Sequence, residues 1–229
     1  MAVPVDPRWS RVLALAVHEF RTPLTVVAGY MRMLLKDRAG PLSDQQRRLL
    51  EEAEKSCGRL SALVAEMSDL AQLEASTAAF NRSEVDLRSL LADSIAALPQ
   101  LIDHQVEVEL SVGNEPAMVK GDAVRLKAAF SALLGALRRE LVNSNRLLVR
   151  LSRRSHGGGP TSWIAIADET HIAELEAADP ETLGVFDEWR GGVGLSLPVA
   201  RRVIAAHGGG IWSATGDVKA AAAVALPYG

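Results

Sequence analysis

Residues 18–24 read His-Glu-Phe-Arg-Thr-Pro-Leu and gather reactive side chains on one turn of a predicted helix. Residues three and four apart share a helix face, so Arg21 and Thr22 lie one turn beyond His18. A neutral imidazole can attack a phosphoryl group, a neighbouring carboxylate can orient its other nitrogen or take its proton, and a guanidinium binds phosphate. This combination predicts phosphoryl transfer through histidine. The candidate catalytic residues are His18, Glu19, Arg21 and Thr22.

Pro23 lies inside the same predicted helix. Proline has no N–H, so the carbonyl of Glu19, four residues back, loses its intrahelical partner and the helix can bend just beyond His18. A bend there helps to expose the imidazole ring. The alternative is a surface histidine on an ordinary helix, and the seven residues taken together argue against it.

Two predicted helices position this motif. Apolar residues of the first recur at alternating steps of four and three, which is typical of a coiled-coil seam; they are Leu13, Val17, Phe20, Leu24, Val27, Met31 and Leu34. After a break at residues 37–42, Ser43 and Gln46 form the pattern of a capping box that opens the second helix. The apolar residues of that helix keep the same step and are Leu49, Ala53, Leu60, Leu63, Met67 and Leu70.

A two-helix hairpin buries too little apolar surface to be stable alone. The sequence therefore predicts a four-helix bundle made from two copies, and hence a homodimer. The loop between the helices decides whether the second domain of one subunit faces its own His18 or that of the partner, and the sequence leaves this handedness open.

The pattern changes after residue 76, and the polar stretch 77–84 is typical of a linker. Beyond it, periodicity predicts helices at 85–98, 123–141 and 195–206. The predicted strands are 106–112, 146–152, 163–168, 210–214 and 219–226. The expected fold class is therefore α+β: a helical hairpin over residues 1–76, a linker, and an α/β sandwich over residues 85–229.

Composition limits the function further. The 229 residues are 48% hydrophobic, which is ample for a folded core, and the net charge of −3 gives no indication of a nucleic-acid surface. The single cysteine, Cys57, excludes an intrachain disulfide. Because no uninterrupted apolar run reaches the length of a bilayer span and the start does not resemble a signal peptide, we expect no membrane segment and a cytoplasmic location.

The segment around His18, residues 13–35, resembles the dimerisation and phosphoacceptor segment of bacterial two-component sensor histidine kinases. The resemblance implies that His18 is phosphorylated, that Glu19 is the acid/base, and that Thr22 positions water when such proteins dephosphorylate a partner. It also implies that the partner is a response-regulator receiver domain, which would dock on residues 24–35 and the early second helix.

The order of elements after the linker resembles the ATP-binding domain that histidine kinases share with gyrase, Hsp90 and MutL. Glycines that precede a helix let the backbone approach phosphates, and residues 192–197 read Gly-Val-Gly-Leu-Ser-Leu. Residues 185–190 resemble an aromatic segment of the nucleotide lid, or else form a surface loop with a buried aromatic anchor. The resemblance implies ATP and magnesium as cofactors. The implied nucleotide-binding residues are Asp168, Arg138, Gly192, Gly194 and Leu195.

Two nucleotide motifs depart from the family pattern. The family places a magnesium-coordinating asparagine where this chain has Gly135, which carries no ligand atom, so no metal-ligating residue is predicted. The family pattern Asp-x-Gly-x-Gly reads Asp-Glu-Thr-His-Ile at residues 168–172, so both glycines are missing. Asp168 can still accept the adenine amine, but Glu169 adds negative charge near the phosphates.

Three hypotheses follow. The chain is an active ATP-dependent autokinase, or a phosphorelay protein that exchanges a phosphoryl group between His18 and a receiver aspartate, or a non-catalytic module that binds a regulator. The intact His18 motif argues against the third, and the eroded nucleotide motifs argue against the first. We therefore expect a phosphorelay protein with weak or lost autokinase activity. Neither His171 nor His207 has a metal-ligand spacing, and His207 is expected to close a helix before Gly208.

Overall fold

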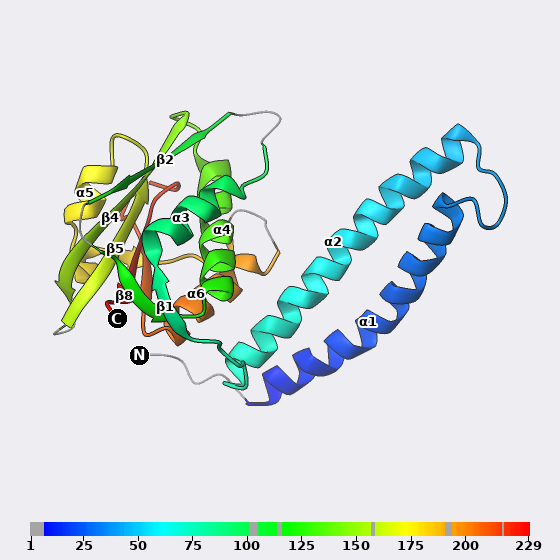
Figure 1. The fold of residues 1–229 in the computed structure, drawn as a ribbon, viewed down its shortest axis with the longest axis horizontal. Coiled ribbons are helices and arrows are strands. Elements are labelled where there is room, and N and C mark those ends of the chain that lie inside the picture. The colour runs from blue at the N-terminus through cyan, green and yellow to red at the C-terminus, as the bar shows by residue number, and fades with distance from the viewer. Residues whose placement is uncertain (1–6, 101–104, 114–115, 157–158, 191–193, 217) are drawn as a thin grey trace. The chain divides into compact units, whose positions relative to one another are not determined.

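The computed structural model describes residues 7–100, 105–113, 116–156, 159–190, 194–216 and 218–229. The chain forms two compact units, Met1–Ala78 and Ala79–Gly229 (Figure 1). The division falls within the predicted linker. The predicted linker extends too far, to residue 84, because the first strand of the second unit already begins at Ser83.

The first unit is a helical hairpin of α1 (Pro7–Leu35) and α2 (Asp44–Glu74). The predicted capping box is confirmed: the backbone N–H of Gln46 donates to Ser43 Oγ at 3.3 Å, and the N–H of Ser43 donates to Gln46 Oε1 at 2.9 Å. The helix α1 continues through Pro23 without interruption.

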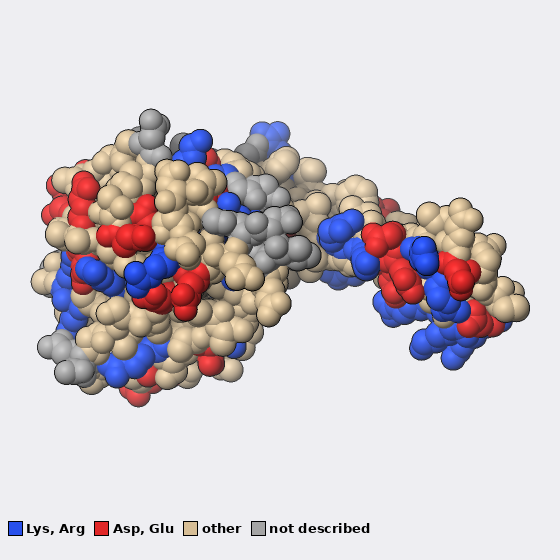
Figure 2. Space-filling model, turned by 90° about the horizontal axis from the view of Figure 1, so that it is seen from above, with Lys and Arg blue, Asp and Glu red and all other residues tan. Residues whose placement is uncertain are grey.

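Charged side chains close the loop of the hairpin. Arg47 donates to the carbonyl of Leu35 at 2.9 Å and to both carboxylate oxygens of Asp37 at 2.8 Å. Figure 2 shows basic and acidic side chains interspersed on this part of the hairpin. Arg47 therefore ties the start of α2 to the end of α1.

The predicted seam is only partly inside the hairpin. Leu13, Val17 and Met31 of α1 are buried, and they meet a strip on α2 that comprises Cys57, Val64, Leu70 and Ala71. Other predicted seam residues are exposed, namely Phe20, Val27, Leu49, Leu60 and Leu63. The sequence predicts these residues as core of a bundle made from two copies, and this stays a prediction. Within one hairpin they are exposed, because two helices in contact bury only one strip each and leave the neighbouring apolar strip uncovered.

One helical segment among the described residues, Arg8–Leu35, is long and apolar enough to cross a membrane by length and composition, with a mean hydropathy of 1.2. The expectation of no membrane segment stays a prediction, because this criterion rests on length and composition only. Core helices of soluble proteins and signal sequences meet the same criterion, so the finding is weak evidence. The segment is the helix that carries His18 and packs on α2.

The second unit is built on a mixed six-stranded sheet of order β2-β4-β5-β8-β7-β6, in which only the β2–β4 pair is parallel. Its strands are β2 (Glu107–Val112), β4 (Arg146–His156), β5 (Gly159–Ala167), β6 (Gly184–Val185), β7 (Gly210–Ser213) and β8 (Ala222–Pro227). A separate two-stranded sheet pairs β1 (Ser83–Asp86) with β3 (Met118–Gly121).

Helices cover both faces of the large sheet. On one face lie α3 (Leu87–Ala96), α4 (Ala123–Glu140) and α6 (Ser196–Ala206), and on the other lies the short α5 (Ile172–Ala177), which is followed by a 3₁₀ turn at Pro180–Thr182 (Figure 1). The core under α5 is formed by alternate residues of β5 and β8 with Ile172 and Leu175. The α/β sandwich expected from the sequence is thus confirmed as a layered fold.

Several predicted element boundaries were wrong. The helix expected at 85–98 is the strand β1 followed by α3, because Asp86 caps the helix by accepting from the N–H of Arg88 at 3.1 Å. The strands β4 and β5 are longer than predicted and pair with each other as an antiparallel hairpin. Neither β3 nor α5 was predicted, because elements of only four and six residues show too little periodicity.

Close packing at Gly209 provides a test of this fold. A β-carbon built at Gly209 would lie 2.4 Å from the carbonyl oxygen of Ala225 and 2.8 Å from Leu226 Cδ2. We therefore expect Gly209→Ala to lower the free energy of unfolding by about 2–3 kcal/mol, since backbone on β8 must move. Gly159→Ala is the matched control, because nothing lies within 4 Å of its β-carbon position. Urea unfolding curves for both variants check this, and equal stability would contradict the described packing.

Candidate functional site

The His18 side chain projects from α1 into solvent. It is 80% exposed, and its Nδ1 lies 3.4 Å from Glu19 Oε1, whose side chain is 71% exposed. When Nδ1 carries the proton and donates it to Glu19, the lone pair is on Nε2. This arrangement provides an accessible nitrogen nucleophile with a carboxylate on its other nitrogen.

A groove of about 340 Å³ runs beside His18 between α1 and α2. The described residues that line it are Ser10, Arg11, Ala14, Val17, His18, Arg21, Ser68, Ala71, Gln72, Ala75 and Thr77. Two of the predicted site residues, His18 and Arg21, therefore meet at one surface. Thr22 is exposed on the same turn but does not line this groove. Sequence reasoning missed Arg11, which precedes His18 by two helical turns and so lies on the same side of α1.

In the second unit, Asp168 follows β5 and is held by the turn that starts α5. Its Oδ1 accepts from the backbone N–H groups of Thr170 and His171, each at 2.9 Å, and lies 2.7 Å from His171 Nδ1. Glu169 turns away to accept from Ser144 Oγ at 2.7 Å, a hydrogen bond that lowers its pKa. The side chain expected at the adenine amine is thus engaged within its own turn.

Arg138 lies in α4, is only 8% exposed and donates to the carbonyl of Pro99. Burial lowers its pKa. Gly135, one turn earlier, is also buried, and a β-carbon there would make only ordinary contacts of 3.7–3.9 Å with Arg139 and Leu98. The position would therefore admit a β-carbon but carries no magnesium ligand. Within the described ranges, no group of three or more His, Cys, Asp or Glu side chains is placed to hold a metal ion.

The predicted phosphate loop is described only in part. Gly192 lies outside the described residues, whereas Gly194 has a φ of +68°, a conformation that favours glycine. Leu195 directly precedes α6. Asp168, Arg138 and the glycine segment thus do not supply a complete donor set for a magnesium nucleotide among the described residues.

Arg190 was noted only as part of a lid-like segment, and its contacts explain how that segment is held. Its guanidinium lies 4.5 Å from the centre of the buried Phe186 ring and donates to the carbonyl of Lys219 at 2.9 Å. Its Nε lies 3.6 Å from Glu140 Oε2. Burial lowers the pKa of Arg190 and raises that of Glu140. Phe186 is therefore a buried aromatic anchor for residues 186–190.

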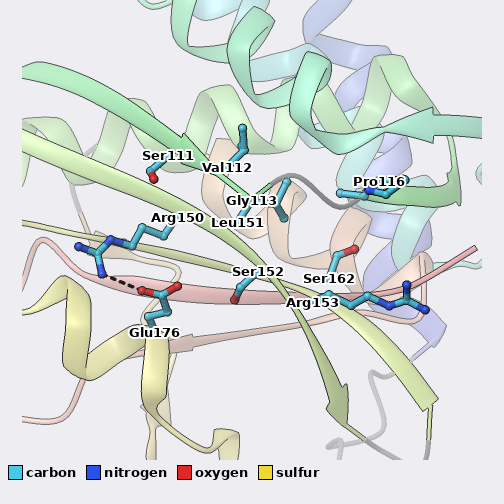
Figure 3. A pocket seen from close by; sticks show the side chains of 11 residues that line it. Ser111, Val112, Gly113, Pro116, Arg150, Leu151, Ser152, Arg153, Ser162 and Glu176 are labelled. Atoms are coloured by element: carbon cyan, nitrogen blue, oxygen red, sulfur yellow. Dashed lines mark hydrogen bonds and ion pairs between the residues drawn. The ribbon is translucent and has the colours of Figure 1, made fainter.

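A cavity of about 440 Å³ lies elsewhere in the second unit, at the end of β2 beside β4, β5 and α5 (Figure 3). Arg150 and Glu176, which both line it, form an ion pair of 2.7 Å, and Ser152 Oγ is buried without a hydrogen-bond partner among the described residues. None of the predicted nucleotide-binding residues lines this cavity. Sequence reasoning did not identify it, because its residues come from four separate elements.

His207 is buried, and both its ring nitrogens are used by the protein. The Nε2 atom accepts from the N–H of Asp122 at 2.9 Å, and Nδ1 lies 2.7 Å from the carbonyl of Val203. The ring also meets the edge of Phe80 at a centroid distance of 5.2 Å. His207 therefore joins the end of α6 to the start of α4, which leaves neither nitrogen for a metal.

Burial lowers the pKa of His207. Because the folded value lies below the ordinary value of about 6.5, the unfolded chain binds this proton more tightly. The stabilisation is therefore fully present above about pH 6.5 and is lost as the pH falls below it. We expect the unfolding free energy of the second unit to fall between about pH 7 and about pH 5, and more steeply in the native chain than in His207→Asn. The unfolding free energy at each pH is measured by denaturant titration. An equal dependence of this free energy on pH in the two chains would contradict this assignment.

Comparison with known proteins finds similarity to histidine kinases and sensor proteins. Residues 8–76 match the His Kinase A (phospho-acceptor) domain. The chain is 27% identical over 209 residues to the circadian input-output histidine kinase CikA of Synechococcus elongatus, covering 87% of this chain and 27% of that protein. It is 28% identical over 194 residues to the phosphate regulon sensor protein PhoR of Pseudomonas aeruginosa, covering 83% of this chain and 43% of that protein.

Among solved structures, full-length ShkA in complex with AMPPNP has a TM-score of 0.70 and 24% identity, with 98% of this chain and 46% of that chain covered. This likeness shows the fold. The chain spans less than half the length of each of these relatives.

Proposed function

Because this chain belongs to the two-component sensor histidine kinase family, we propose that it is a phosphorelay protein that carries a phosphoryl group on His18. Residues 1–76 form the dimerisation and phosphoacceptor domain, and residues 85–229 form the domain of the ATP-binding type. The partner is a receiver-domain aspartate of a response regulator. We also propose a cytoplasmic location.

The observation that carries this proposal is the exposed His18 imidazole with Glu19 3.4 Å from Nδ1. In the transfer step, Nε2 attacks the phosphorus of the receiver's acyl phosphate, the P–O bond to the aspartate breaks, and the carboxylate leaves. Glu19 holds the Nδ1 proton and so stabilises the positive charge that develops on the ring. The reverse attack by the aspartate returns the phosphoryl group. Thr22, exposed on the same turn, is assigned to orient water for dephosphorylation.

We further propose that autophosphorylation from ATP is weak or absent. Asp168 is held by His171, Arg138 is bonded to Pro99, and position 135 has no ligand atom. Phosphoryl transfer from ATP relies on positioning and on charge stabilisation by magnesium and cationic groups, so these departures remove much of what the reaction needs.

The second candidate function is an active ATP-dependent histidine kinase. The likeness to ShkA, which was solved with AMPPNP, and the positive φ of Gly194 favour it. In this case residues other than Gly135 must hold the magnesium ion. A third candidate, a regulator-binding module without catalysis, leaves the exposed His18–Glu19 pair without a role.

The exposed apolar strip of the hairpin supports a homodimer. Phe20, Val27 and Leu60 are each about half exposed, and Leu49 is 66% exposed. A second copy of the hairpin that packs against this strip completes a four-helix bundle. On each helix the exposed strip adjoins the buried one, since Phe20 follows the buried Val17 by three residues and Leu60 follows the buried Cys57 by three. Both strips can therefore belong to the core of one bundle.

The experiment that separates the candidates has two arms. In one, the chain is incubated with γ-labelled ATP and magnesium, and in the other with isolated receiver domains that were phosphorylated with labelled acetyl phosphate. Label from the receiver arm alone supports the proposed phosphorelay protein. Strong label from ATP supports the kinase instead, and label from neither arm supports the non-catalytic module.

A further inference from the structure

The groove beside His18 has a composition suited to an anion. Arg11 and Arg21 line it, and no carboxylate side chain is among its described lining residues. Building on the function proposed above, we propose that this groove receives the phosphoryl group of phosphorylated His18, and that Arg11 of α1 and Gln72 of α2 are positioning residues that hold it there.

The placement of charge supports this proposal. A phosphoryl group on Nε2 carries close to two negative charges at neutral pH. Arg21 follows His18 by one turn and Arg11 precedes it by two turns, so the two cationic residues flank the imidazole along α1 and line the same groove. Glu19 lies at Nδ1 and does not line the groove, which separates the carboxylate from the phosphoryl oxygens.

The shape of the groove fits the same role. The groove is lined by the buried Val17 and Ala71 and by the exposed Ala14 and Ala75. Because three of these side chains are alanines, the space beside the imidazole stays open. A volume of about 340 Å³ exceeds what one phosphoryl group fills and leaves room for water. Gln72 stands on the opposite wall, where its amide lies 3.5 Å from Ser68 Oγ and can donate to a closer acceptor.

Hydrogen bonds from Arg11 and Gln72 stabilise the phosphorylated chain without changing the nucleophile. The guanidinium of Arg11 neutralises charge on the phosphoryl oxygens and disfavours protonation of the ring, which precedes cleavage of the P–N bond. Since the groove is open to solvent, screening limits the effect. We expect Arg11→Ala to shorten the lifetime of phosphohistidine about 3–5-fold and Gln72→Ala about 2-fold.

The test loads the full chain with potassium phosphoramidate, which needs neither ATP nor a receiver. The P–N bond of the reagent breaks, ammonia leaves, and a P–N bond to the imidazole forms. Phosphorus NMR follows the phosphohistidine resonance and its decay, and the resonance that is missing in His18→Gln identifies His18. Arg48→Ala, at an exposed arginine near the start of α2, is the matched control.

The proposal expects a shifted resonance and faster decay in Arg11→Ala, restoration of both by Arg11→Lys, and no change in Arg48→Ala. Equal lifetimes and chemical shifts in the native chain and Arg11→Ala would overturn it, as would an equal change in Arg48→Ala. If the chain loads normally but no receiver exchanges with it, the proposed function fails while this inference stands.

Discussion

A chain with His18→Gln will accept no detectable phosphoryl group from phosphorylated receiver domains. Glutamine has about the polarity and length of histidine but no imidazole nitrogen, so the nucleophile is lost while the exposed helix surface is kept. Glu19→Gln leaves the nucleophile in place and removes the carboxylate 3.4 Å from Nδ1. We expect it to slow transfer about 10²-fold. Rapid-quench measurements with a receiver domain charged by acetyl phosphate give both results.

Gln45→Ala is the control for these variants, because Gln45 is exposed near the start of α2, far along the hairpin from His18. It should transfer at the native rate. Transfer that persists in His18→Gln would place the phosphoryl group on another residue and would remove the basis of the proposed function. If Glu19→Gln transfers at the native rate, the Glu19 carboxylate takes no part in phosphoryl transfer.

Replacing Leu60 with glutamate will convert the proposed dimer to monomers. Leu60 is 52% exposed within one hairpin, and in a four-helix bundle the same side chain is buried twice, once in each subunit. Because about half of each Leu60 side chain is still exposed before association, loss of the two leucines weakens association by about 1.5–3 kcal/mol. Burial of the introduced carboxylates adds a further penalty. Sedimentation velocity over a range of concentrations measures the change.

Ala62→Glu is the matched control for this prediction. Positions 60 and 62 lie about 200° apart around the helix, so the same charge is added on the other side of α2. Ala62 is already exposed, and its variant should remain a dimer. Dissociation by Ala62→Glu to the same extent, or a native Leu60→Glu dimer, would exclude the exposed apolar strip as the interface.

The helical hairpin was predictable because its signals are local. The capping box of Ser43 and Gln46 needs only residues three apart, and the same is true of the turn that carries His18. Which apolar residues pack inside the hairpin and which stay exposed was not predictable. Nothing in the spacing of Val17 and Phe20 states that one faces α2 while the other is 54% exposed.

The second unit was less predictable where short elements or distant partners decide the structure. The sequence at 168–172 looks like a loop, but Asp168 caps a turn into α5 through contacts within three residues. Arg138 binds the carbonyl of Pro99, 39 residues earlier in the chain. Arg11 was not predicted as a site residue, because it lies outside the His18 motif. Only in the folded hairpin do Arg11 and His18 line the same groove.

The most direct test of the central claim is to locate the phosphoryl group after exchange with a receiver. The native chain is incubated with phosphorylated receiver domains, digested under alkaline conditions that preserve phosphohistidine, and sequenced by tandem mass spectrometry. Our account predicts a phosphoryl group on His18 and on no other residue of the chain. A phosphoryl group found elsewhere, or none on any peptide while the receivers remain charged, would contradict it.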